Sequence, residues 1–209
     1  MSVAVVCDFD GTIVTEDFAK DLLKDYCKMV WQAADQDFKD GKISLRDMME
    51  KEVLGLQMTR QELSEYARKR VKFRPGFWEF YGAVLDRGFR LIIISEGLAE
   101  YIRPFFNPEI PIYSNECEEA DGHLKLLSPH ASKICDKCGT CKKNVVTALK
   151  EKGYFVIYIG DGVSDYCASR FADLRLARGQ LARHLAINDT EFMHFEDFND
   201  ILGAFESGF

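Results

Sequence analysis

The stretch that decides the fold of this chain reads Val3-Ala4-Val5-Val6-Cys7-Asp8-Phe9-Asp10-Gly11-Thr12. Its first residues are apolar throughout, which is typical of a strand that is buried on both faces. Side chains two positions apart on a strand point to the same face, so the carboxyl groups of Asp8 and Asp10 converge where the strand ends. Two like charges held that close disfavour each other's ionisation. A divalent cation would relieve this conflict, as would a division of labour with one carboxyl group ionised and the other protonated, and we expect both.

Short apolar runs alternate with amphipathic stretches along the rest of the chain. Further strands are predicted at Arg90–Ile94 and Tyr154–Ile159, and helices at about Gly76–Arg87 and Lys142–Lys152. Strands that alternate with helices in this way indicate a parallel sheet with helices on both faces. We therefore predict an α/β fold, a Rossmann-like core of three layers with a mostly parallel sheet.

The segment between the first strand and the rest of the sheet is different. Residues 15–74 contain apolar side chains at helical spacing, such as Phe18, Leu22 and Tyr26, and no convincing strand. A single crossover connection needs far fewer residues, which disfavours ordinary crossover helices as the alternative. We predict an all-helical cap at 15–74 inserted into a core formed by residues 1–14 and 75–209.

The composition of the chain excludes some classes of binding partner. Its 209 residues include 27 basic and 34 acidic ones, which gives a net charge of -7. The basic residues are dispersed, so nucleic acid and acidic membranes are not expected partners, and no apolar run has the length of a membrane-spanning helix. Seven cysteines cannot all form pairs, which favours a reducing cytoplasm. Nothing in the sequence separates a monomer from a homodimer.

Three more polar motifs follow predicted strands or open a predicted helix. Ser95 follows an apolar run, Lys142 opens a helix, and Asp161 and Asp165 lie in the Gly-rich turn after the strand that ends at Ile159. The carboxyl ends of parallel strands form the usual binding crevice of such folds. Each motif has a plainer interpretation, respectively a turn or helix cap, a solvated lysine, and turn chemistry. Turn chemistry explains one of the aspartates but not both.

Charge arithmetic predicts a metal ion at this edge. Asp8, Asp10, Asp161 and Asp165 face one lysine, so the ionised site would repel a phosphate group unless a cation came with it. Oxygen ligands that leave room for water and a phosphate oxygen suit Mg²⁺. The ion would reduce the repulsion and orient a phosphoryl group.

In this order, Asp-x-Asp-Gly-Thr, a strand-terminal serine, a lysine and Gly-Asp-x-x-x-Asp resemble the haloacid dehalogenase superfamily of phosphatases. The resemblance covers nearly the whole chain and implies that residues 15–74 are the small helical cap of that superfamily. It further implies a phosphoric monoester hydrolase that acts on a small phosphorylated metabolite. The Cys-rich stretch that ends in Cys141-Lys142 and the run Phe73-Arg74-Pro75-Gly76-Phe77 resemble the small-cap enzymes of the superfamily, among them the phosphatases of methionine salvage, phosphoserine and phosphocholine.

The resemblance also implies roles for the motif residues. Asp8 would be the nucleophile that takes the phosphoryl group, and Asp10 the acid and base that serves the leaving alcohol and then the water. The ligands of Mg²⁺ would be Asp8, the carbonyl group of Asp10, Asp161 and, in support, Asp165. The phosphate site would comprise Ser95, Glu96, Gly97 and Lys142, with Lys143 as the alternative lysine. Because the family often has glycine where this chain has Glu96, that side chain must point away from the phosphate or select a positively charged substrate.

A cysteine cluster stands immediately before Lys142. Cys135, Cys138 and Cys141 have the C-x-x-C-x-x-C spacing of a zinc knuckle, with Cys117 or His130 as the fourth ligand. A structural Zn²⁺ there would fix the loop that positions the lysine. A loop of reduced thiols or a redox-labile pair is the alternative interpretation.

Two further residues are candidates for substrate specificity. Asp17 matches the cap-side carboxylate that grips an amino group in phosphoserine enzymes, and a helix cap is its alternative role. Arg74 would reach a substrate oxygen, or else it is a structural arginine at the hinge. Two functions other than hydrolysis stay open, a phosphotransferase or mutase and a non-catalytic phospho-aspartate switch.

Overall fold

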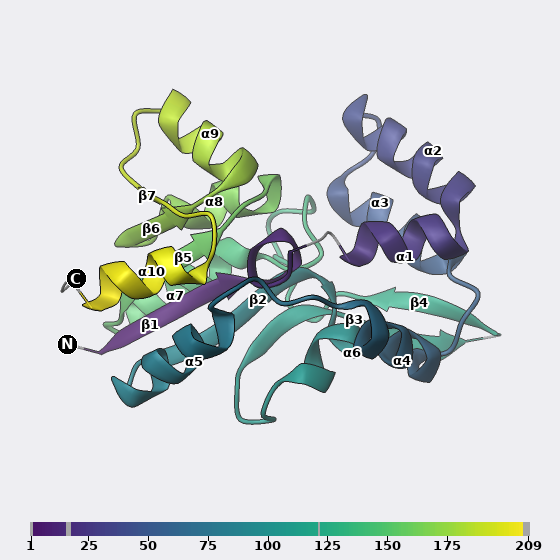
Figure 1. The fold of residues 1–209 in the computed structure, drawn as a ribbon. Helices are drawn as coiled ribbons and strands as arrows, with labels where there is room; N and C mark the ends of the chain where they lie inside the picture. The colour runs from purple at the N-terminus through teal and green to yellow at the C-terminus, as the bar shows by residue number, and fades with distance from the viewer. Residues whose placement is uncertain (1, 16–17, 121, 207–209) are drawn as a thin grey trace. The chain divides into compact units, whose positions relative to one another are not determined.

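The computed structural model describes residues 2–15, 18–120 and 122–206, which belong to two compact units (Figure 1). The core unit comprises residues 1–16, 72–94 and 142–209, and the insert unit comprises residues 17–71 and 95–141. The strand order is β4-β3-β2-β1-β5-β6-β7. The predicted α/β fold with a mostly parallel sheet is confirmed.

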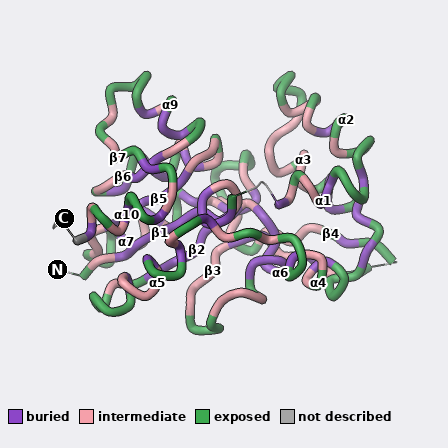
Figure 2. The backbone as a smooth tube through the Cα atoms, in the orientation of Figure 1, coloured by how far each residue is buried: buried purple, intermediate pink, exposed green. Residues whose placement is uncertain are grey.

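The parallel strands of the core unit bring the predicted motifs to one edge. They are β1 (Val3–Asp8), β2 (Arg90–Leu98), β5 (Phe155–Gly160), β6 (Leu174–Ala177) and β7 (Met193–His194). β1 lies between β2 and β5, with Asp8 in register with Ile94 and Cys7 with Ile159. β1 and β5 are buried almost throughout (Figure 2), as their continuous apolar sequences require.

Helices cover both faces of this sheet. α5 (Phe77–Asp86) and α10 (Phe198–Glu206) lie side by side on one face, where the rings of Phe77 and Phe198 meet edge to face with centroids 5.1 Å apart (Figure 1). The remaining helices are α7 (Lys142–Glu151), α8 (Tyr166–Ser169) and α9 (Gly179–Ile187). The predicted strands and helices of the core are thus found within a few residues of their expected bounds.

The insert unit contains the predicted helical segment. Its helices are α1 (Phe18–Tyr26), α2 (Lys28–Lys39), α3 (Leu45–Gly55), α4 (Arg60–Arg70), α6 (Ala99–Ile102) and the short η2 (Arg103–Phe105). Capping boxes begin two of them, Ser44 with Asp47 for α3 and Thr59 with Glu62 for α4. The ring of Phe18 packs on that of Tyr101 at 4.7 Å between centroids.

An antiparallel pair of strands in the insert unit was not expected from the sequence. β3 (Ile112–Ala120) and β4 (His123–Leu127) pair with Cys117 opposite Leu126. The second half of β3 carries several glutamates, so it lacks the apolar run that identified the other strands. Residues 95–141 belong to the same compact unit as the helical segment. The domain bounds 15–74 and 75–209 stay a prediction.

Among the residues described, no helix has both the length and the apolar character needed to cross a membrane. The cytoplasmic location and the monomeric or homodimeric state stay predictions.

Candidate active site

A tight turn follows Asp8 at the end of β1. The segment η1 (Phe9–Ile13) is a single wide turn closed by a hydrogen bond of 3.1 Å from the Val14 amide to the Phe9 carbonyl. Within it, Asp10 (φ -72°, ψ 125°) and Gly11 (φ 78°, ψ -14°) have the dihedral angles of the central residues of a type II turn. Such a turn needs glycine at its second central position. A Cβ atom on Gly11 would also lie 2.5 Å from Oδ2 of Asp161, so the glycine lets the two loops approach.

Lys142, the first residue of α7, reaches the aspartates from a third place in the chain. Its side chain is buried, and Nζ lies 2.5 Å from Oδ1 of Asp8 and 2.7 Å from Oδ1 of Asp165. The neighbouring Lys143 is exposed, with its Nζ 4.8 Å from the ring centroid of Phe171. Of the two predicted lysines, Lys142 is therefore the one that contacts the carboxylates.

Asp165 is the most completely bonded acid of the site. It ends η3 (Val163–Asp165) and is fully buried. Its Oδ2 accepts the backbone amides of Asp161 (3.0 Å) and Gly162 (2.9 Å), while Oδ1 accepts the Tyr158 hydroxyl (2.6 Å) and Lys142. These bonds fix the loop after β5 and leave Asp165 in a supporting position.

Asp8, Asp161 and Asp165 each place a carboxylate oxygen within 4.8 Å of the other two. No other set of three or more His, Cys, Asp or Glu ligand atoms is so close among the residues described. The hydroxyl of Thr12 donates to Oδ1 of Asp161 at 2.9 Å. An all-oxygen donor set with excess negative charge fits a hard cation such as Mg²⁺ better than a softer metal.

The pKa values of these groups reflect their burial and crowding. Burial raises the pKa of Asp8 well above its usual range, Lys142 opposes this shift, and the charges of Asp165 and Asp161 add to it. The pKa of Asp161 is raised by burial and then by the charge of Asp165. For Lys142, burial favours the neutral amine, yet the two carboxylates outweigh it and raise its pKa. Lys142 is thus the charged partner of an acidic cluster that another cation would stabilise.

Ser95, Glu96 and Gly97 lie at the end of β2, in the part of that strand assigned to the insert unit. The buried hydroxyl oxygen of Ser95 accepts the amide of Gly97 at 2.8 Å. Oε2 of Glu96 accepts the amides of Gly139 (3.2 Å) and Thr140 (3.1 Å). Glu96 therefore holds the loop before α7, and a phosphate-binding role for these residues stays a prediction.

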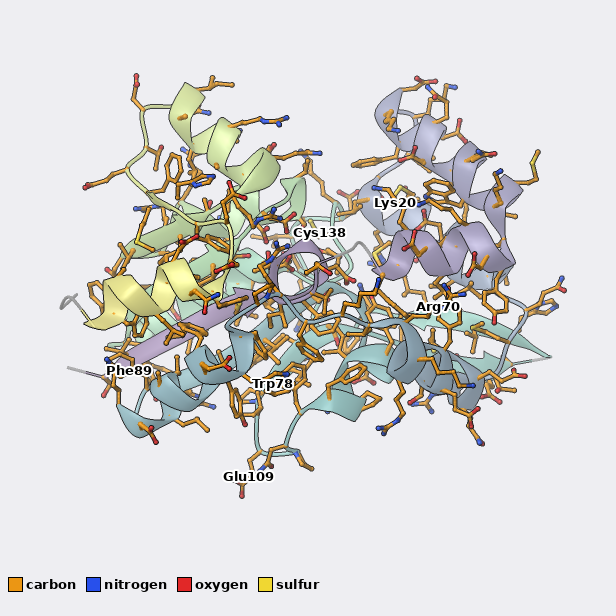
Figure 3. All side chains as sticks on the ribbon, in the orientation of Figure 1. Lys20, Arg70, Trp78, Phe89, Glu109 and Cys138 are labelled. Carbon is orange, nitrogen blue, oxygen red and sulfur yellow. The ribbon has the colours of Figure 1, made fainter. Side chains whose placement is uncertain are left out.

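The cysteines of that loop do not form a ligand cluster in the described structure. Cys135 is exposed, Cys138 (Figure 3) and Cys141 are half-buried, and Cys117 is buried in β3. They are absent from the close ligand sets found among the described residues, so the structural Zn²⁺ is not supported by this geometry and stays a prediction. Burial raises the pKa of Cys117, and the neighbouring charge of Glu100 raises it further.

The two specificity candidates have different outcomes. Asp17 lies outside the described residues. Arg74 is buried, and its guanidinium donates to the backbone carbonyls of Gly11 (2.7 Å) and Thr12 (2.8 Å). The described contacts of Arg74 are thus structural.

The sequence pattern of the family described as haloacid dehalogenase-like hydrolase matches residues 5–170, a span that contains all four motifs. The chain belongs to this family. The curated relatives of this hydrolase include the 2-hydroxy-3-keto-5-methylthiopentenyl-1-phosphate phosphatases of Bacillus velezensis and Brevibacillus brevis. The first is 28% identical over 97% of the chain and 89% of the relative, and the second 27% identical over 96% and 93%. The bifunctional enzyme MtnB/MtnX of Bacillus licheniformis is 29% identical over 94% of the chain, which spans only 48% of that enzyme.

Solved structures share the fold of this hydrolase over nearly its whole length. A phospho-aspartyl intermediate analogue of phosphoserine phosphatase has a TM-score of 0.73 at 16% identity and covers 97% of the chain and 98% of its own. A phosphoserine phosphohydrolase-like protein of Francisella tularensis has a TM-score of 0.71 at 24% identity, covering 98% and 99%. The prediction of a phosphatase of this superfamily is confirmed by the family match and the relatives together.

Three contacts of the hydrolase's site were missed by reasoning from the sequence. Thr12 and Tyr158 belong to the predicted motif and strand, but the sequence assigned neither of them a role in the site. Arg178 follows β6 and donates to the Gly11 carbonyl at 3.0 Å. A strand-end position was the only signal for Arg178, and no motif marked it.

Proposed function

We propose that this hydrolase is a Mg²⁺-dependent phosphomonoesterase that works through an aspartyl-phosphate on Asp8. The observation that carries the proposal is the contact of Lys142 with Asp8 beside the carboxylates of Asp161 and Asp165. A carboxylate held next to a buried cation, in a site with further acidic ligands, fits a nucleophile that attacks a phosphate bound with a metal ion.

The residues of the site divide the steps of this reaction between them. An oxygen of Asp8 attacks phosphorus while Asp10 protonates the departing alcohol oxygen, and Asp10 then removes a proton from the water that hydrolyses the acyl phosphate. Lys142 balances the charge of the nucleophile and of the phosphate oxygens, and the hydroxyl of Ser95 is the proposed second ligand of the phosphate. Asp8, the Asp10 carbonyl and Asp161 would hold Mg²⁺, with Asp165 in support, and the ion would supply charge neutralisation and orientation of the phosphoryl group.

The nucleophile and the acid are tested by replacing each with asparagine. We expect Asp8→Asn to abolish turnover. We expect Asp10→Asn to accumulate a slow, acid-stable phosphoenzyme from p-nitrophenyl phosphate, whose leaving group needs no proton, and intact-protein mass spectrometry detects it. Asp189→Asn is the matched control, because Asp189 is exposed and its φ of 48° suits asparagine. Near-normal phosphatase activity of Asp8→Asn would disprove the nucleophile assignment.

The substrate we propose is the methionine-salvage enol phosphate that the relatives' names give. Phosphoserine is the runner-up on structural likeness alone, and phosphocholine follows from the small-cap resemblance. The initial rates of inorganic phosphate release from the three compounds, measured without an acceptor alcohol, give the kcat/KM values that rank them. The enol phosphate should have the highest kcat/KM, whereas a preference for phosphoserine or phosphocholine would refute this assignment.

The same assay separates hydrolysis from the other functions. Phosphate release without an acceptor argues against a phosphotransferase or mutase. A phosphorylated protein that persists for minutes with Asp10 intact would instead favour a phospho-aspartate switch. For the cysteine loop, about one Zn²⁺ per chain that is lost in Cys138→Ser would support the structural zinc.

A further inference from the structure

Arg74 lies where the chain returns from the insert unit to the core unit. Residues 13–15 and 72–74 run antiparallel, with a bridge between Val14 and Phe73 and a hydrogen bond of 2.9 Å from the Thr15 amide to the Lys72 carbonyl. The Arg74 amide donates to the Ile13 carbonyl at 2.8 Å. The backbone of Arg74 is therefore fixed against the turn that carries Asp10.

The side chain of Arg74 binds the same turn. Nε donates to the Thr12 carbonyl (2.8 Å), and Nη2 donates to the carbonyls of Gly11 (2.7 Å) and Val14 (3.4 Å). Nη1 donates to the Glu196 carbonyl at 3.2 Å. Together with the backbone bond, Arg74 holds the carbonyl groups of four consecutive residues, from Gly11 to Val14. A buried guanidinium so fully used by neutral acceptors organises backbone and has little donor capacity left for a substrate.

A second arginine, Arg178, donates to the same Gly11 carbonyl oxygen as Arg74. Nη1 of Arg178 donates to the Gly11 carbonyl at 3.0 Å, and the Arg178 amide donates to the Gly160 carbonyl at 3.2 Å. Two cations on one carbonyl oxygen repel each other, so this arrangement costs free energy. Such local costs are typical of sites where function requires one fixed geometry, here one orientation of that peptide. The oriented peptide joins Gly11 to Thr12 and is separated from Asp10 by one peptide unit of the same turn.

We propose that Arg74 and Arg178 are positioning residues that hold the Gly11 carbonyl so that the turn presents the Asp10 carboxyl group to the leaving oxygen. The proposal rests on the proposed function, in which Asp10 is the general acid. A general acid must lie within hydrogen-bond reach of the atom it protonates, and a misplacement of about 1 Å can cost about 10²-fold in rate. Lysine cannot replace either residue, because it lacks the planar fork of donors.

A leaving-group test separates positioning of the acid from general damage. An alkyl phosphate ester needs a proton on its leaving oxygen, whereas p-nitrophenolate leaves without one. For Arg74→Lys, we expect kcat/KM to fall about 10²-fold on the alkyl phosphate that the wild-type enzyme hydrolyses best, the size of a lost general acid. On p-nitrophenyl phosphate we expect less than about a threefold loss in kcat/KM, with an early burst of nitrophenol because water activation by Asp10 is slowed. Arg183→Lys, on an exposed face of α9, is the matched control.

Each other outcome has a defined meaning. Equal losses of kcat/KM on both esters would overturn the positioning role, and a raised KM with unchanged kcat would restore the substrate-binding role for Arg74. If Arg74→Lys does not fold by circular dichroism, Arg178→Lys is measured in the same way and must show the same leaving-group difference. Wild-type enzyme that releases no phosphate, or an active Asp8→Asn, would defeat the proposed function itself, whereas a normal wild type with a uniform Arg74→Lys loss defeats only this inference.

Discussion

Two independent features of the structure require glycine at position 11. Its φ of 78° is costly for any residue with a Cβ atom, by about 1–2 kcal/mol, and that atom would lie 2.5 Å from Oδ2 of Asp161. Gly41 has a similar φ of 70° but no neighbour within 4 Å of the added atom. We expect Gly41→Ala to lose about 1 kcal/mol of unfolding free energy with unchanged activity. Gly11→Ala should lose in addition about 10²-fold in kcat, because Asp161 must move.

Urea unfolding and steady-state kinetics of both variants check this prediction. The comparison isolates the contact from the backbone strain, since the strain is common to the two glycines. Full activity of Gly11→Ala would mean that the close approach of the two loops is not needed for catalysis.

Tyr158 shows how a strand residue becomes part of the site. Its hydroxyl donates to Oδ1 of the buried Asp165 at 2.6 Å, and burial followed by the charge of Asp165 raises the pKa of the phenol well above its usual range. We expect Tyr158→Phe to lower the free energy of unfolding by about 1.5–3 kcal/mol, the usual value of a hydrogen bond to a charged group. Activity should survive in part, because Asp165 keeps Lys142 and two amides.

The matched variant is Tyr154→Phe, which removes a hydroxyl from a half-buried residue just before the same strand. Chemical denaturation of the two variants at one pH provides the measurement. Equal stability of Tyr158→Phe and Tyr154→Phe would contradict the argument.

At the scale of elements, capping hydrogen bonds fix where two helices of the insert unit begin. Oδ2 of Asp47 accepts the Ser44 amide at 3.0 Å, and Oγ of Ser44 accepts the Asp47 amide at 3.1 Å. The hydrogen bonds from the Ser44 hydroxyl and amide lower the pKa of Asp47 in the folded state. A carboxyl group with a lowered folded pKa contributes stability above its unfolded pKa, about 3.9, and loses it as the pH falls through the folded value.

We therefore expect Asp47→Asn to lower the thermal midpoint at pH 6 and to match the wild type near pH 2, if both remain folded there. Glu50→Gln removes an equal charge from an exposed position of the same helix and serves as control. Thermal melts at several pH values measure the difference. A difference that stays constant from pH 6 to pH 2 would show that the capping carboxylate is not its source.

The sequence predicts a strand well where its apolar run is continuous. The strands that begin at Val3, Arg90 and Phe155 contain such runs, and their positions followed directly from them. β3 escaped detection because glutamates occupy much of it. Likewise the aspartates could be predicted from their places after strands. Arg178 could not, because its role depends on the approach of the loop after β6 to the Gly11 carbonyl, which no local pattern encodes.

For the whole molecule, the acidic cluster makes stability depend on divalent metal. Without a cation, burial and then the charge of Asp165 raise the pKa of Asp161, so ionising both acids costs folding free energy. A ligand at 100 times its Kd stabilises the folded state by about 2.7 kcal/mol. For a chain of this size that corresponds to a rise of about 5–10 °C in the thermal midpoint. We expect saturating Mg²⁺ to raise the midpoint of the wild-type protein by that amount and EDTA to reverse the rise.

The difference in thermal midpoint between Asp161→Asn and the wild type should change sign when Mg²⁺ is added. Asparagine removes one of the repelling charges and keeps an oxygen for the Thr12 hydroxyl, so the metal-free variant should melt at or above the metal-free wild type. The variant has lost a ligand, so in Mg²⁺ it should melt below the wild type. Melting curves with and without the ion, beside Asp189→Asn as a control that should follow the wild type, test both halves. An equal Mg²⁺ shift in Asp161→Asn and the wild type would place the ion away from these aspartates, and the mechanism would have to be rebuilt without them as metal ligands.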